Sequence, residues 1–100
     1  MSYLGIYLDQ LIEKKRLNSD TELAKFLQIS RQHMSRIRKE GSMSDEKCMV
    51  LAKELDINPL ELFALVRAKK SKTKETREIW MQLHRETKRV KAYILLNSNE

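Results

Sequence analysis

The fold is decided by the stretch LAKFLQISRQHMSRIRKEG, residues 23–41. Its apolar side chains recur every three or four residues, the period of an α-helix, on both sides of a short connection around Gln28. Ser30 suits the N-cap of the second helix, and Gly41 suits its C-terminal end. Two short helices joined by about three residues cross at a steep angle, and this arrangement is a helix-turn-helix.

Small and apolar residues at the joint favour the same arrangement. Ala24 is expected where the two helices cross, because a larger side chain there would push them apart. Ile29 is expected to fill the corner between them. Met34 and Ile37, three residues apart, then face the core and leave the opposite side of the second helix exposed.

Composition favours one small helical domain with a polyanionic partner. The chain has 100 residues, of which 41% are hydrophobic, and only two glycines and one proline interrupt it. Its formal net charge is +6. The charge is +3 over residues 1–41, −3 over residues 42–66 and +7 over residues 67–92, so two basic regions flank an acidic one.

Capping signals and periodicity divide the rest of the chain into further helices. The expected helices span about residues 3–16, 20–27, 30–41, 44–55, 58–67 and 73–95. Their N-caps are expected at Ser19, Ser30, Ser44 and Asn58. The sequence leaves open whether the last two helices are separate or continuous.

The fourth and fifth helices carry specific expectations. The fourth turns Cys48, Leu51, Ala52 and Leu55 inward. The fifth begins with Pro59, turns Leu60, Phe63 and Ala64 inward, and uses the Glu61 carboxylate to reach back to its own N-terminus.

The fold class is therefore all-α, with a five-helix helix-turn-helix domain over residues 1–68. A basic, amphipathic C-terminal helix occupies residues 69–100 as a dimerisation or fold-back element.

The exposed face of the second helix of the helix-turn-helix is suited to the major groove of DNA. Arginine bonds guanine in bidentate fashion there, and glutamine bonds adenine. Helical spacing places four residues where they are expected to read bases: Arg31, Gln32, Ser35 and Arg36. The basic and hydroxyl side chains around them, and those at helix N-termini, are expected to contact phosphates: Ser19, Thr21, Ser30, His33, Arg38, Lys39, Ser42 and Ser44.

Residues 20–41 resemble the helix-turn-helix of the lambda-repressor/Cro (XRE-type) family. The matching motifs are Thr21-Glu22-Leu23-Ala24, Leu27-Gln28-Ile29-Ser30 and Met34-Ser35-Arg36-Ile37. Gln28 stands where the family has a turn glycine, and Arg38 stands where it often has an acidic residue. With the two helices that follow, the resemblance covers about residues 3–68 and implies a five-helix DNA-binding domain.

This resemblance implies a sequence-specific repressor that binds a palindromic operator in double-stranded DNA as a homodimer. The basic segment after the domain is also similar to that of small regulators of phages and prophages. A protein antirepressor is one possible further partner under this interpretation.

The apolar stripe of the last helix bears on the partner. Six residues are candidates for a dimer interface: Ile79, Trp80, Leu83, Val90, Tyr93 and Ile94. The helix has two other interpretations. It can fold back on its own domain, or it can bind a partner protein such as a toxin, which would make the chain an antitoxin-type interaction module.

Other function classes are not favoured by the sequence. The single cysteine, Cys48, is expected to be a small buried residue, while His33 and His84 are expected at the surface. No catalytic, metal-binding or cofactor-binding motif is found in the sequence, so we expect neither an enzyme nor a cofactor. No apolar run approaches a membrane span, and we expect a cytoplasmic protein.

Overall fold

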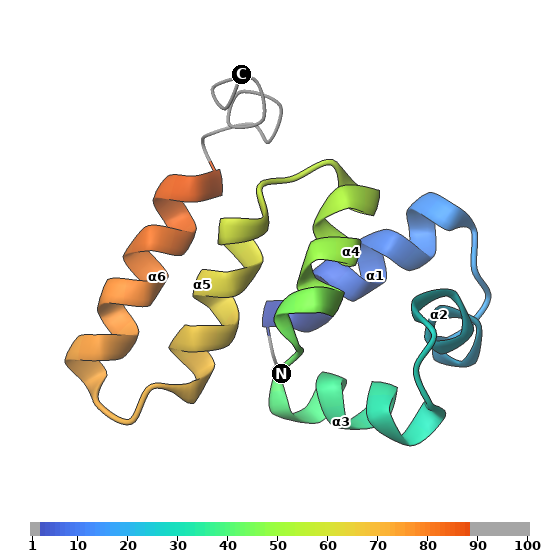
Figure 1. Cartoon of the computed structure of the whole chain (residues 1–100), viewed down its shortest axis with the longest axis horizontal. Helices are drawn as coiled ribbons and strands as arrows, with labels where there is room; N and C mark the ends of the chain where they lie inside the picture. The colour runs from blue at the N-terminus through green and yellow to red at the C-terminus, as the bar shows by residue number, and fades with distance from the viewer. Residues whose placement is uncertain (1–2, 89–100) are drawn as a thin grey trace.

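The computed structural model describes residues 3–88, and its helices confirm the predicted all-α fold (Figure 1). The described residues form six helices without strands: α1 (Tyr3–Lys15), α2 (Asp20–Leu27), α3 (Arg31–Glu40), α4 (Asp45–Leu55), α5 (Pro59–Lys70) and α6 (Lys74–Lys88). Figure 1 shows α2 nearly end-on and α3 lying across the view, so the two cross steeply as a helix-turn-helix.

The predicted N-caps are confirmed at four helices. The Ser19, Ser30 and Ser44 hydroxyls accept hydrogen bonds from backbone N–H groups three residues on, at 3.3, 3.0 and 3.2 Å. Asn58 Oδ1 accepts from the Leu60 N–H at 3.0 Å. Each bond satisfies an N–H that has no partner within its helix, so these helices begin where local chemistry places them.

Helix α2 ends without glycine in a left-handed turn. Gln28 has φ 60° and ψ 47°, and the next residue, Ile29, donates its N–H to the Ala24 carbonyl at 2.9 Å. This is a Schellman ending, which normally uses glycine because a Cβ is disfavoured at positive φ. The same pattern ends α1 and α4, at Arg16-Leu17 and Asp56-Ile57. In all three, an apolar residue follows and packs against the core.

Helix α5 lies between α4 and α6, which changes the prediction for its buried face (Figure 1). Leu60 was expected inward but is 45% exposed. Ala64 is buried as predicted, and further apolar residues on two sides of the helix are buried with it: Leu62, Leu65, Val66 and Ala68. A single inward stripe does not describe a helix that packs on both sides.

Helices α5 and α6 are separate, and α6 packs antiparallel against α5. The Ser71 hydroxyl donates to the Arg67 carbonyl at 2.8 Å at the end of α5, and Thr73 Oγ1 accepts from the Thr76 N–H at 3.2 Å at the start of α6. Residue 68, the predicted domain boundary, lies inside α5. The described part of α6 therefore folds back on the domain.

The predictions for two polar residues, Glu61 of α5 and His84 of α6, are wrong. Glu61 does not serve as a helix-start carboxylate; it is 5% exposed and accepts a hydrogen bond from the Tyr7 hydroxyl of α1. His84 is not at the surface; it is 7% exposed, and its Nδ1 lies 2.9 Å from the Glu61 carbonyl. A carbonyl only accepts, so Nδ1 carries the hydrogen. This buried polar cluster joins α1, α5 and α6.

Cys48 is confirmed as a small buried residue, with its thiol directed at the Met43 carbonyl at 3.8 Å. Burial, aided by the charge of Asp45, raises the pKa of the thiol to about 11. The thiol is therefore neutral near pH 7 and is a poor nucleophile.

Within residues 3–88, no helix is long and apolar enough to cross a membrane, and no group of three or more His, Cys, Asp or Glu residues is placed to hold a metal ion.

We expect Gln28→Gly to stabilise the protein by up to about 1 kcal/mol, because it removes the Cβ from a left-handed position. The same change at Gln10, an exposed residue inside α1, should instead destabilise by about 1 kcal/mol, because glycine weakens a helix interior. Urea unfolding monitored by circular dichroism measures both. Equal destabilisation by the two variants would contradict the structure of the turn.

Candidate nucleic-acid interface

Helix α3 exposes a continuous polar stripe. Met34 and Ile37 are each 1% exposed and attach the helix to the core. The opposite side carries the exposed residues Arg31, Gln32, Ser35, Arg36 and Lys39. Helix α3 lies along an edge of the molecule, where a partner can approach it directly (Figure 1). Four of these five were predicted to read bases, and Lys39 was predicted to contact phosphates.

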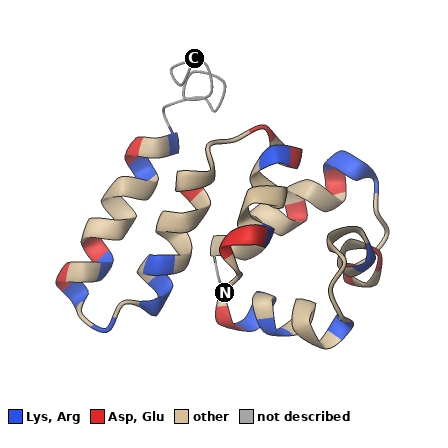
Figure 2. Cartoon of the chain, viewed as in Figure 1, with Lys and Arg blue, Asp and Glu red and all other residues tan. Residues whose placement is uncertain are grey.

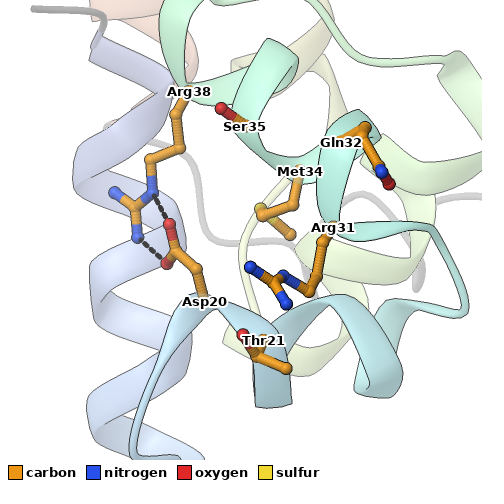
Figure 3. Close-up of a pocket in the computed structure, with 7 residues that line it drawn as sticks. All are labelled: Asp20, Thr21, Arg31, Gln32, Met34, Ser35 and Arg38. Carbon is orange, nitrogen blue, oxygen red and sulfur yellow. Dashed lines mark hydrogen bonds and ion pairs between the residues drawn. The ribbon is translucent and has the colours of Figure 1, made fainter.

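A depression separates this stripe from the N-terminus of α2 (Figure 3). Helix α2 contributes Asp20 and Thr21, and α3 contributes Arg31, Gln32 and Ser35. Figure 3 shows the Arg31 side chain running toward α2, whereas Gln32 points away from it. Because Asp20 and Thr21 begin α2, the backbone N–H groups of its first turn lie at this depression, and such groups suit phosphate oxygens.

A second depression lies on the other side of α3. His33 and Arg36 of α3 line it together with Ser42 and Ser44 at the start of α4. Lys70, the last residue of α5, lines it too. The exposed stripe therefore lies between two helix N-termini, and both sides carry positive charge.

The capping serines occupy the predicted phosphate positions but have a structural task as well. Ser19, Ser30 and Ser44 each use the hydroxyl oxygen to accept a backbone hydrogen bond. A hydroxyl also carries a donor hydrogen, so capping leaves it able to bond a phosphate oxygen. Phosphate contact by these three residues, and by Thr21, His33, Lys39 and Ser42, stays a prediction.

Arg38, which was predicted to contact phosphate, makes several contacts within the fold. Its Nε and Nη2 donate to the Asp20 carboxylate at 3.1 and 2.8 Å, and Nη2 lies 2.8 Å from Asp9 Oδ1. Its Nη1 donates to the Gly5 carbonyl at 3.1 Å. These contacts join α3 to α1 and α2, so we assign Arg38 to the fold.

The ion pairs of Arg38 also change the electrostatics of the DNA-facing side. Burial disfavours the guanidinium charge, but hydrogen bonds and charge from Asp20 and Asp9 outweigh it and raise the pKa of Arg38. The Asp20 carboxylate lies at the N-terminus of α2, where it would repel a phosphate. The ion pair with Arg38 offsets the Asp20 charge beside the α2 N–H groups.

Lys70 lines this surface but was not among the residues predicted to contact phosphates. Its signal was present, since Lys69-Lys70-Ser71-Lys72 is plainly basic. The segment is 28 or more residues along the chain from Gly41, however, and only the packing of α5 places Lys70 beside α3.

A steeply crossed helix pair with a polar, basic second helix defines the class of helix-turn-helix DNA-binding proteins. A family model described as the Cro/C1-type HTH DNA-binding domain matches residues 7–68, and the chain belongs to this family. The protein is thus a DNA-binding regulator of the Cro/C1 type. No curated protein and no solved structure matches the chain.

We expect Arg38→Lys to destabilise the protein by about 1–2 kcal/mol, because lysine cannot make the forked contact with Asp20 while bonding α1. Thermal unfolding should show a fall of roughly 4–16 °C in Tm. Arg36→Lys is the matched control, because Arg36 is exposed on the same helix, and its Tm should change little. Equal Tm values for the two variants would contradict a structural role for Arg38.

Proposed function

We propose that the protein is a sequence-specific transcriptional repressor that binds a palindromic operator as a homodimer. The observation that carries the proposal is the exposed stripe of α3 between the N-termini of α2 and α4. An α-helix fits the major groove, and helix N-termini on either side of it suit the two flanking phosphate backbones.

Base reading is assigned to the first two turns of α3. The N-terminal residues of a recognition helix contact base edges in helix-turn-helix complexes. Arg31 and Gln32 stand there and offer bidentate partners for guanine and adenine, and Ser35 and Arg36 follow one turn later. Lys39, at the far end of the stripe, is assigned to phosphate.

Dimerisation would place two copies of α3 in successive major grooves, about 34 Å apart. The outer side of α6 is our candidate contact, because Ile79 is 66% exposed there. Trp80 is less available: its ring lies 5.7 Å from the guanidinium carbon of Arg67, in a cation–π contact. Leu83 is half-buried, and Val90, Tyr93 and Ile94 lie outside the described residues.

A bound dimer would repress by covering a promoter, which assigns the protein to the cytoplasm, where the DNA is. A phage or prophage origin belongs to the same proposal and rests on the resemblance of the basic C-terminal segment.

An antitoxin-type module is the second candidate, in which the same exposed side of α6 around Ile79 would bind a partner protein instead of a second copy. Affinity purification of the tagged protein with the product of a neighbouring gene would separate this alternative from self-association.

Selection from a random library of double-stranded DNA tests the repressor proposal without knowledge of the operator. We expect an enriched inverted repeat, bound ~10³-fold or more tightly than scrambled DNA. Sedimentation should show two protein chains per duplex. Failure to enrich any sequence would reject sequence-specific binding.

Substitutions on α3 should separate base reading from phosphate contact. We expect Arg31→Ala and Gln32→Ala each to lower the affinity for the selected site by about 5- to 150-fold, which corresponds to one lost bidentate contact. The affinity for scrambled DNA should scarcely change. Lys39→Ala should weaken both duplexes by a similar factor. Fluorescence anisotropy measures all three. A uniform loss for all three variants on both duplexes would contradict the assigned roles.

A further inference from the structure

Most of the net positive charge of the protein lies in one short segment outside the helix-turn-helix. Residues 67–77 contain six basic residues and one acidic residue, and so carry +5 of a formal net charge of +6. This segment is the end of α5, the α5–α6 turn and the start of α6. Figure 2 shows its basic residues gathered at one corner of the molecule, on the same edge as α3.

Lys70 brings this corner next to α3, on the side of α3 that faces the start of α4. It lines the same depression as His33, Arg36 and Ser44. Glu40 also lines it and is the acidic residue there. A phosphate at the N-terminus of α4 would therefore lie near His33 of α3 and the positive Lys70 of α5.

Further basic residues lie at the C-terminal end of α3. Gly41, which ends α3, lines a groove together with Lys69, Lys74 and Arg77. Glu78 lines this groove as well, so its rim is basic with one carboxylate. Positive charge from the α5–α6 corner thus surrounds the end of α3 on two sides.

The lysines of this corner make no ion pairs with other described residues. Arg67 is engaged, since it pairs with Asp45 at 3.8 Å and lies over the rings of Phe63 and Trp80. Within residues 3–88, no ion pair within 4.0 Å involves the four exposed or turn lysines Lys69, Lys70, Lys72 and Lys74. Four positive side chains in one short segment repel one another, and a polyanion bound beside them would reduce this repulsion.

We propose that Lys69, Lys70, Lys72 and Lys74 form a second DNA contact, which binds the phosphate backbone flanking the segment read by α3. The inference rests on the proposed function, and it extends the footprint beyond the Cro/C1-type domain at residues 7–68. The contact is electrostatic, so it adds affinity and salt dependence without adding base preference.

The test is the double variant Lys70→Gln/Lys72→Gln, assayed by anisotropy over a salt series on the DNA enriched from the random library. Each lost phosphate contact should reduce the slope of log K against log[salt] by about 0.9 in magnitude, hence by about 1.8 per bound subunit. The ratio of the affinities for the enriched and the scrambled duplex, which reports base preference, should be unchanged.

The matched control is Lys53→Gln/Lys88→Gln, which removes the same charge from two exposed lysines at the C-terminal ends of α4 and α6. Its salt slope should stay close to that of the wild type. Equal changes in the two double variants would overturn the proposal, because net charge alone would explain them.

Duplex length gives a second readout. Wild type should bind the enriched site more tightly when about one helical turn, roughly ten base pairs, is added at each end, and the Lys70/Lys72 variant should lose this gain. An enriched sequence with no effect of duplex length or of these lysines would overturn this inference alone. Failure of the wild type to enrich any sequence would instead reject the proposed function.

Discussion

A ten-residue helix that buries only Met34 and Ile37 is poorly oriented by hydrophobic packing alone, yet α3 must be held at a defined angle to present its polar face. Arg38 supplies the missing constraint. It bonds Asp20 of α2 and both Asp9 and the Gly5 carbonyl of α1, so α3 is tied to two other helices at once. The left-handed turn at Gln28 and the Ser30 cap set the other end of the helix.

This constraint also shapes the field around α3. The Arg38–Asp20 pair removes a negative charge from the first turn of α2, and the α4 side carries Lys70 across from Arg36. The result is a ridge of polar side chains with positive surroundings on both flanks, which suits a groove bordered by two phosphate backbones. The basic α5–α6 corner continues that surface toward flanking DNA because α5 ends beside α3.

Helix boundaries were predictable because the signals that set them are local. Serine or asparagine at an N-cap bonds N–H groups two or three residues away, so Ser19, Ser30, Ser44 and Asn58 need no tertiary information. The buried face of α5 was not predictable in this way. Two neighbouring helices cover α5, so its buried residues do not follow a single stripe. Leu60, which a single inward stripe would bury, is exposed. His84 and Glu61 were misjudged because their partners lie 23 and 54 residues away, on α5 and α1.

Caps and helical periodicity act within a few residues, so the all-α class and the helix-turn-helix could be predicted from the sequence alone. The same holds for the exposure of four residues on α3: Arg31, Gln32, Ser35 and Arg36. The packing of the helices was needed to show that α6 folds back on α5, that Arg38 bonds to α1 and α2, and that Lys70 lies beside α3. Those outcomes depend on which helices meet in space, and charge or hydrophobicity along the chain does not encode that for residues so far apart.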